Sequence, residues 1–312
     1  MHYSLAPLAG YTDLPFRRIC RAFGLNYAST ALIDAGALAH GNPDSDFILH
    51  RGEDEPWLQV QLLGSLIQDL RLSVRLLRDG PWHFDALDFN MGCPVRKVLK
   101  RGAGAALPRT PEHALECLKM LRDEWPGPLT VKMRILDETC PDTTLAFAKQ
   151  LQDIGIQGLA IHGRIAQRIY SGPVHAPIIR AVREHLSIPV TANGGVFSFQ
   201  DALRLSQESN CTRIMVARGA IGNPWLFREL AAGKNLPPPP REEVLQVAEE
   251  HLAQMVTEYG EKPAMILGRK ILCGYLHGRG FSHELKGQIV HITTWEDFQR
   301  LLALFRASPP LP

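Results

Sequence analysis

A possible reactive centre lies in the stretch "DALDFNMGCPVRKVLKRGAGAAL" (85–107). Asn90 stands at the end of an apolar run that is typical of a buried strand, and Cys93 follows in a Gly-Cys-Pro turn. Four basic residues come next, namely Arg96, Lys97, Lys100 and Arg101. Because nearby cations and an accessible loop make a thiol more reactive, Cys93 could act as a nucleophile or as a proton donor.

Polar residues and glycines also stand at the ends of other apolar runs. They are Ala9 and Gly10, Gln61, Lys132 and Arg134, His162 and Arg164, Asn193 to Gly195, and Arg218 with Gly219. A lysine inside "LTVKMRI" (129–135) is unfavourable to bury unless an anion or an electron-rich group faces it. One such residue could belong to an internal salt bridge of a plain scaffold. Because polar residues and glycines recur at the ends of most of the apolar runs, they instead predict a shared site.

Two glycine-containing turns, "ANGG" (192–195) and "ARGA" (217–220), follow the last two apolar runs. Alone, either would be an ordinary turn. Backbone N–H groups of turns after the seventh and eighth strands of a barrel commonly bind phosphate. Together, the two turns favour a phosphorylated cofactor or substrate.

These residues need a scaffold that brings strand ends together. Short apolar runs alternate with amphipathic segments of helical period. We expect strands at 3–9, 26–32, 57–64, 86–92, 129–135, 158–164, 189–195 and 212–219. We expect helices at 14–24, 67–80, 110–125, 142–155, 176–186 and 198–209. Since continuously apolar strands need helices on their outer face, this alternation predicts a (β/α)8 TIM barrel over residues 1–232. A doubly wound open sheet is disfavoured because no G-x-G-x-x-G follows the first strand.

A proline run, "LPPPP" (236–240), cannot continue a helix and predicts a linker over 233–240. Residues 241–312 are purely helical in pattern and predict a small helical-bundle domain. Its second helix has an expected apolar stripe of Ile266, Ile271, Leu272, Tyr275 and Leu276. Its last helix is expected to open with a capping box from Thr293 to Glu296.

Composition narrows the class of protein. The chain has 312 residues, 45% hydrophobic and 21% charged, with a formal net charge of +2. A nucleic-acid partner would therefore be held by a local basic patch. We expect no metal, because the six cysteines form no C-x-x-C pair. We also expect no disulfide framework, and a reducing cytoplasm as the location. The first ten residues do not resemble a signal peptide, and no apolar run is long enough to span a membrane.

We expect no chemical role for the other five cysteines. Cysteine is among the residues most often buried, so inert burial is the default interpretation. Cys20, Cys117, Cys211 and Cys273 fall within helix or strand patterns, and we expect them to be buried. Cys140 is expected in a loop.

Several segments in their order along the chain resemble the tRNA-dihydrouridine synthases. They are "APLAGYTDLPFR", "NMGCPVRKV", "VKMR", "IHGR", "ANGG" and "ARGA". The resemblance covers the whole chain, including a helical C-terminal domain of the expected size. Its most specific part is the Asn-x-Gly-Cys-Pro motif before a basic loop. The sequence pattern as a whole most resembles the bacterial B-type members.

The resemblance implies a flavin enzyme that reduces selected uridines of tRNA, with FMN as cofactor and NADPH as reductant. In that scheme FMN gives hydride to C6 of the uracil and Cys93 gives a proton to C5. The implied cofactor-binding residues are Pro7, Leu8, Ala9, Gln61, Asn90, Lys132, His162, Asn193, Gly194, Gly195, Ala217 and Arg218. Of these, Lys132 would lie near the N1/O2 side of the flavin, where a cation stabilises the reduced ring.

The implied tRNA contacts are Arg96, Lys97, Lys100, Arg101, Arg134 and Arg164. A uracil in folded tRNA must leave its stack to reach a flavin, and the basic loop would meet the surrounding phosphates. The alternative for that loop is an ordinary solvated charge run. The helical domain is implied as a second tRNA contact, with a monomer acting on one tRNA.

Three positions depart from the family pattern. Thr30 stands where many members carry Glu, so no role is transferred to it. The segments "ANGG" and "ARGA" replace Asn-Gly-Asp and Gly-Arg-Gly-Ala, and both keep their backbone amides.

Two other functions stay open on the sequence. One is an FMN barrel of the dihydropyrimidine or dihydroorotate dehydrogenase type that acts on a free pyrimidine. The helical domain and the basic loop disfavour it, since a small substrate needs neither. The other is a catalytically silent tRNA-binding protein, which the presence of Cys93, Lys132 and His162 disfavours.

Overall fold

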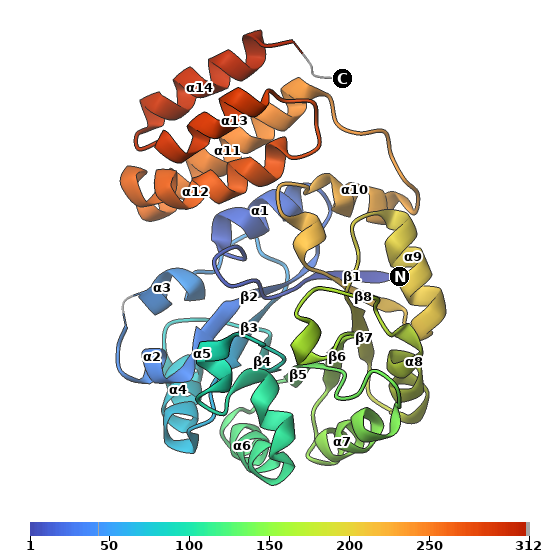
Figure 1. Ribbon diagram of the computed structural model, residues 1–312. Coiled ribbons are helices and arrows are strands. Elements are labelled where there is room, and N and C mark those ends of the chain that lie inside the picture. The colour runs from blue at the N-terminus through green and yellow to red at the C-terminus, as the bar shows by residue number, and fades with distance from the viewer. Residues whose placement is uncertain (43, 310–312) are drawn as a thin grey trace.

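The computed structural model describes residues 1–42 and 44–309, and its centre is a closed parallel barrel (Figure 1). The strands are β1 (His2–Leu5), β2 (Tyr27–Asp34), β3 (Leu58–Leu63), β4 (Ala86–Met91), β5 (Leu129–Arg134), β6 (Gly158–His162), β7 (Val190–Asn193) and β8 (Arg213–Val216). β1 pairs in parallel with both β2 and β8, which closes the ring. The predicted (β/α)8 barrel is therefore confirmed, and an open doubly wound sheet is excluded.

Helices cover the outside of the barrel, with short ones in the loops (Figure 1). The barrel helices are α1 (Leu14–Ala22), α2 (Ala35–Ala39), α3 (Asp44–Leu49), α4 (Ile67–Asp79), α5 (Arg96–Leu99), α6 (Pro111–Glu124), α7 (Asp142–Asp153), α8 (Ala176–His185), α9 (Phe199–Ser209) and α10 (Trp225–Ala232). The 3₁₀ turns are η1 (Gly104–Arg109), η2 (Ala166–Arg168) and η3 (Arg218–Ala220). Their apolar faces join the strands in one continuous core, as the helical period predicted.

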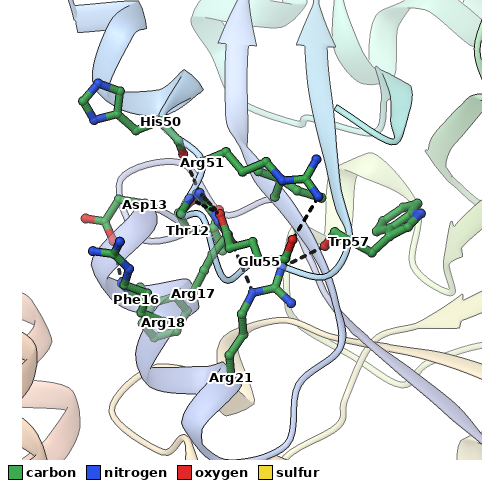
Figure 2. A network of polar contacts seen from close by, with 12 residues as sticks. Thr12, Asp13, Phe16, Arg17, Arg18, Arg21, His50, Arg51, Glu55 and Trp57 are labelled. Atoms are coloured by element: carbon green, nitrogen blue, oxygen red, sulfur yellow. Dashed lines mark hydrogen bonds and ion pairs between the residues drawn. The ribbon is translucent and has the colours of Figure 1, made fainter. Parts of the chain in front are cut away.

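A buried ion-pair network fastens the irregular link between β2 and β3 (Figure 2). Arg17 of α1 is fully buried and binds both oxygens of Glu55, each at 2.8 Å. Arg21 also binds Glu55 at 3.0 Å and donates to the carbonyl of Trp57 at 2.8 Å. Burial alone would raise the pKa of Glu55, but the bonds and charge of Arg17, the N–H of Gly52 and the charge of Arg21 together lower the pKa below its ordinary value. The network thus holds the start of β3 against α1.

A helical bundle follows the barrel. α10 ends at Ala232 and the next helix begins at Arg241, so the expected linker at 233–240 contains no helix. The bundle consists of α11 (Arg241–Tyr259), α12 (Glu261–Leu276), α13 (His283–Gln288), η4 (Ile289–His291) and α14 (Trp295–Ala307). It lies over α1 and α10 at one side of the barrel (Figure 1).

The seam between bundle and barrel is tightly packed. The hydroxyl of Tyr259 donates to Asp13 at 2.7 Å, and the ring of His251 stacks on Phe16. Gly222, with a φ of +62°, lies so close to the backbone of Gly274 that an added Cβ would be 2.1 Å from its carbonyl carbon. A side chain at position 222 therefore cannot be accommodated without separating the two halves.

The predicted capping box is shifted by one residue. Thr294 caps α14, and its partner is Asp297, not Glu296. Asp297 accepts from the backbone of both Thr293 and Thr294, whereas Glu296 points outward and pairs with Arg300. Two adjacent threonines followed by two adjacent acids allow either register, and burial of Phe298 selects the observed one.

Two predicted burials in α12 are wrong. Ile266 is 48% exposed, and Cys273 is also exposed. The buried face of α12 includes Met265, Ile271 and Leu272, and each misassigned residue lies one position beyond it, a rotation of about 100°. Cys20, Cys117 and Cys211 are buried as predicted.

Among the described residues, no helix combines the length and the apolar character that a membrane crossing would require. Within the same part of the chain, no group of three or more His, Cys, Asp or Glu side chains is arranged to hold a metal ion.

Candidate active site at the carboxyl end of the barrel

The predicted site residues gather around a cavity of about 330 Å³ at the carboxyl ends of the strands. We call it the carboxyl-end cavity. The predicted residues that line it are Pro7, Leu8, Ala9, Asn90, Cys93, Arg96, Lys132, Arg134, His162, Arg164, Asn193, Gly194, Gly195, Ala217 and Arg218. Gln61, Lys97, Lys100 and Arg101 are not in its lining. Residues from β4, β5, β6, β7 and β8 thus converge as the barrel geometry requires.

The carboxyl-end cavity is strongly cationic. Its lining includes the five basic residues Arg96, Lys132, Arg134, Arg164 and Arg218, and none of the described lining residues is acidic. Such a surface suits an anionic ligand, because unpaired cations in a partly buried site are unfavourable without one.

Lys132 is held in place inside the cavity. Its ammonium donates to Asn193 at 3.1 Å, and Asn193 in turn donates to the carbonyl of Met215 at 2.8 Å. Burial, together with the charge of Arg134, lowers the pKa of Lys132 to about 8. Lys132 is therefore mostly charged at neutral pH and begins to lose its charge just above it.

His162 is a neutral ring in this setting. Burial lowers its pKa to about 2, and the surrounding cations, among them Lys132, Arg134 and Arg164, act in the same direction. Arg164 donates to Nε2 of His162 at 3.2 Å, which leaves the ring proton on Nδ1. An added Cβ on Gly194 would lie 2.8 Å from the His162 ring, so a glycine is needed there for the ring to reach the cavity wall.

Arg134 and Arg164 organise the loops of the site. Arg134 is 5% exposed and donates to the carbonyls of Gly92 and Ile169, both at 2.9 Å. Arg164 donates to the carbonyl of Gly172 at 3.0 Å. The guanidinium of Arg134 thereby joins the loop that carries Cys93 to the loop after β6.

The turn that carries Cys93 is fixed by Asn90. Oδ1 of Asn90 accepts from the backbone N–H groups of Gly92 and Cys93, at 3.0 and 2.9 Å. On the other side, the N–H of Ala105 donates to the carbonyl of Cys93 at 3.0 Å. Gly104 has a φ of +60°, and a Cβ there would be 2.7 Å from that carbonyl. The thiol is therefore half-buried at a defined position on the cavity wall.

Gln61 lies beneath the cavity. It is fully buried, its side-chain N–H donates to Asp88 at 2.6 Å, and its carbonyl accepts from Asn90 at 2.7 Å. Its backbone N–H donates to Oγ1 of Thr30 at 3.2 Å, at a register shift between β2 and β3. Direct contact of Gln61 with a cofactor stays a prediction, since here it reaches the cavity through Asn90.

The basic loop forms α5 and the turn after it. Arg96, Lys97 and Lys100 are exposed, whereas Arg101 pairs with Asp34. The pairing raises the pKa of Arg101 and neutralises its charge locally. Three cations of this loop are thus presented outward beside the cavity, with Arg96 in its lining.

Sequence reasoning missed an aromatic wall. The guanidinium of Arg218 lies 3.9 Å from the centre of the Tyr170 ring and 5.8 Å from that of Phe197. Both rings are about half exposed and line the cavity. They sit on aperiodic loops, so no pattern marked them. The buried Asp88 was also missed, although its position two residues before Asn90 puts both on the same face of the strand.

A second cavity of about 330 Å³ opens at the other end of the barrel. We call it the amino-end cavity. Aromatic rings of Tyr3, Tyr27 and Trp57 line it, with Arg213 as its only described Lys or Arg and Asp88 as its only described acidic residue. A small cluster that includes Ala6, Ala160 and Met215 lies in the barrel, and Met215 lines both cavities.

A family model described as "Dihydrouridine synthase (Dus)" matches residues 4–308. The chain belongs to the dihydrouridine synthase family. The family predicted from the sequence motifs is thus confirmed, and its match extends over the barrel and the helical bundle.

Curated dihydrouridine synthases resemble the chain over most of their length. A tRNA-dihydrouridine synthase B of Pseudomonas aeruginosa is 33% identical over 91% of this chain and 86% of its own length. A probable tRNA-dihydrouridine synthase of Rhizobium leguminosarum is 35% identical over 87% of this chain and 84% of its own length. Among solved structures, a histamine dehydrogenase from Rhizobium matches with a TM-score of 0.54 and 14% identity, over 81% of this chain and 48% of its own. That likeness shows the barrel fold alone.

The residues that depart from the dihydrouridine synthase pattern lie in the barrel wall or in the lining of the carboxyl-end cavity. Thr30 is fully buried in the barrel wall, where its hydroxyl donates to the carbonyl of Ala31 at 2.7 Å and accepts from Gln61. Gly194 and Gly195 of "ANGG", and Ala217 to Gly219 of "ARGA", all line the carboxyl-end cavity. Neither glycine turn has lost its place at the site.

Proposed function

We propose that the chain reduces specific uridines of tRNA to 5,6-dihydrouridine, with FMN in the carboxyl-end cavity and NADPH as the reductant. The observation that carries this proposal is the lining of that cavity, which combines five basic side chains with glycine turns and Cys93. Family membership supports the reaction, and the relatives named above supply tRNA as the substrate class.

The residues present fit a phosphorylated flavin. Gly194 and Gly195 have φ values of +125° and +69°, and a Cβ on Gly194 would collide with His162, so this turn keeps its backbone open to a ligand. Arg218 stands beside it and offers a cation to a phosphate. Lys132 offers a cation to the electron-rich side of the ring, as Pro7 to Ala9 offer an apolar wall. When bound, the flavin would supply the hydride for the uracil ring.

Cys93 supplies the proton in this proposal. Its thiol donates a proton to C5 of the uracil, and the resulting thiolate, which interacts with the charges of Lys132 and Arg134, later regains a proton from water. Asn90 holds the backbone of this turn so that the thiol stays on the cavity wall. Proton donation from a fixed position is worth about 100-fold to 10,000-fold in rate.

The tRNA would lie across the basic loop and the helical bundle. Arg96 lines the cavity, and Lys97 and Lys100 are exposed on the same short loop, so all three would bind phosphates near the flipped uridine. Lys270 of α12 lies over the ring of Tyr11 at 4.5 Å, so the bundle reaches the loop whose first residues line the cavity. A cytoplasmic monomer acting on one tRNA stays our prediction.

The first experiment is to record the visible spectrum of the purified protein and to follow NADPH oxidation with and without tRNA that lacks dihydrouridine. We expect a flavin spectrum and dihydrouridine formation that depends on tRNA. A flavin spectrum with turnover on free uracil or dihydroorotate would instead show a pyrimidine dehydrogenase. Binding of tRNA with neither flavin nor turnover would show a silent binding protein.

A further inference from the structure

A buried carboxylate underlies the turn that carries Cys93, and it lines the amino-end cavity but not the carboxyl-end cavity. Asp88 lies on β4, 1% exposed, on the same strand face as Asn90. The register of β3 and β4 sets it beside Gln61. One carboxylate oxygen accepts from Gln61 at 2.6 Å, and the other accepts from the hydroxyl of Thr130 at 2.5 Å.

The bonds from Asp88 to Cys93 all run in one direction. Asp88 accepts from the Gln61 amide nitrogen, so the Gln61 carbonyl faces Asn90. That carbonyl accepts from the Asn90 amide nitrogen, so the Asn90 carbonyl faces the turn. There it accepts the N–H groups of Gly92 and Cys93. Each side-chain amide is thereby fixed in one of its two possible orientations.

This direction depends on a group that can only accept. An ionised carboxylate has no proton to donate, whereas an amide can present either its oxygen or its nitrogen. If Gln61 turned over, Asn90 would have to turn as well and would point N–H donors at N–H donors. The turn at Gly92 and Cys93 would then lose both of its bonds.

We propose that Asp88 is a positioning residue, which sets the orientation of Gln61 and Asn90 and thereby holds the Cys93 turn in place for proton donation. The inference rests on the role of Cys93 in the proposed function. Burial raises the pKa of Asp88 above its ordinary value, and the bonds from Gln61 and Thr130 and the charge of Lys132 offset only part of that rise. The oxygen that faces Gln61 accepts its N–H in either case, because a proton on the carboxyl can sit on the oxygen that faces Thr130.

The decisive variant is Asp88→Leu, which keeps roughly the size of the side chain and removes both acceptor oxygens. In the purified protein, alkylation by iodoacetamide is followed by mass spectrometry at Cys93 and at Cys140. Cys140 is also half-buried but lies in the loop after β5, outside the chain of bonds. We expect alkylation of Cys93 to accelerate about fivefold to tenfold, as loss of one or two buried bonds predicts, with no change at Cys140.

Gln59→Leu is the matched control. Gln59 is the other buried glutamine of β3, and its amide donates to Ser29 at 2.7 Å, beside the amino-end cavity. It loses a buried hydrogen bond of the same kind but leaves the bonds to Cys93 intact, so we expect native alkylation at Cys93. Should Asp88→Leu not fold, Gln61→Met breaks the same chain of bonds and carries the same expectation.

An unchanged rate at Cys93 in the folded variant would overturn the proposal, as would an equal rise at Cys140 or in Gln59→Leu. Faster amide hydrogen exchange in the segment 90–105 of Asp88→Leu, and not of Gln59→Leu, would support it independently. Both measurements need neither NADPH nor tRNA. Their result is therefore independent of whether the chain reduces uridine.

Discussion

The barrel has two cavities of similar size, about 330 Å³ each, one at either end, and they differ in what lines them. The carboxyl-end cavity holds five Lys or Arg side chains and two glycines of positive φ. The amino-end cavity holds aromatic rings with a single Arg and a single Asp among its described residues. Size therefore does not distinguish the reactive end, whereas charge and open backbone do.

Strand β8 shows the difference within a few residues. Arg213 begins the strand and lines the amino-end cavity, whereas Arg218 follows it and lines the carboxyl-end cavity. Arg218 is stacked on Tyr170 and so has a defined position, while Arg213 is exposed. The comparison favours the carboxyl end as the ligand-binding end, and it can be tested at both ends.

The largest expected effect is at the carboxyl end. Cys93→Ala should lower dihydrouridine formation about 100-fold to 10,000-fold, because the proton donor is lost. The flavin spectrum and the reduction of flavin by NADPH should stay normal. Cys140→Ala, a half-buried thiol elsewhere, is the control and should retain native turnover. Unchanged dihydrouridine formation in Cys93→Ala would show that another group is the acid.

The link that leads into the amino end of β3 should respond in stability. Glu55→Gln leaves Arg17 buried without its carboxylate and should lower the free energy of unfolding by about 3 kcal/mol. Urea denaturation followed by circular dichroism measures the loss. Glu53 is exposed, so Glu53→Gln should change the free energy of unfolding little. Turnover per folded molecule should stay native in both, and a large loss of turnover without a loss of stability would contradict the division between the two ends.

Lys132 should make the affinity of the carboxyl-end cavity for FMN depend on pH. Since its pKa is about 8, its positive charge is lost as pH rises through that value. The flavin-free protein should therefore bind FMN more weakly at pH 9 than at pH 7, and Lys132→Met should bind it about tenfold more weakly at pH 7. Fluorescence titration with FMN measures both. Lys149→Met, an exposed control on α7, should behave as native; native affinity in Lys132→Met would remove this lysine from the site.

The two arginines on either side of β8, Arg213 at its start and Arg218 after its end, give a smaller and sharper contrast. Arg218→Gln should weaken FMN binding about fivefold to tenfold, which is the loss of one charge-assisted contact. Arg213→Gln should leave it native, because that residue faces the opposite end. The same titration serves for both variants. Equal losses in the two would mean that overall charge, not position, governs binding.

The smallest expected effect concerns the basic loop. Lys97→Ala should weaken tRNA binding a few-fold and reduce the slope of log affinity against log salt by about 1. Arg101→Ala should change the slope less, since Asp34 already pairs with Arg101. Lys119→Ala, exposed on α6, serves as the control. Filter binding over a range of salt concentrations measures all three.

The barrel and most of the site could be predicted because they depend on local pattern. Alternating apolar runs specify strands and helices, and the barrel then brings Lys132, His162 and Asn193 together at one end. The contact of Gln61 with Asp88 could not be predicted, because it depends on the register between β3 and β4. The stacking of Tyr170 on Arg218 depends on loop conformation, which carries no period in the sequence.

The close approach of Gly222 to Gly274 has a consequence for which nucleotide of an RNA can reach the carboxyl-end cavity. With backbone against backbone and no intervening side chain, the bundle cannot slide along the barrel, and the bond from Tyr259 to Asp13 fixes its rotation. The reach from the Cys93 thiol to the far helices is therefore a constant length. If the bundle also binds the RNA, the protein would select a nucleotide that lies at this fixed distance from the second point of contact on the RNA.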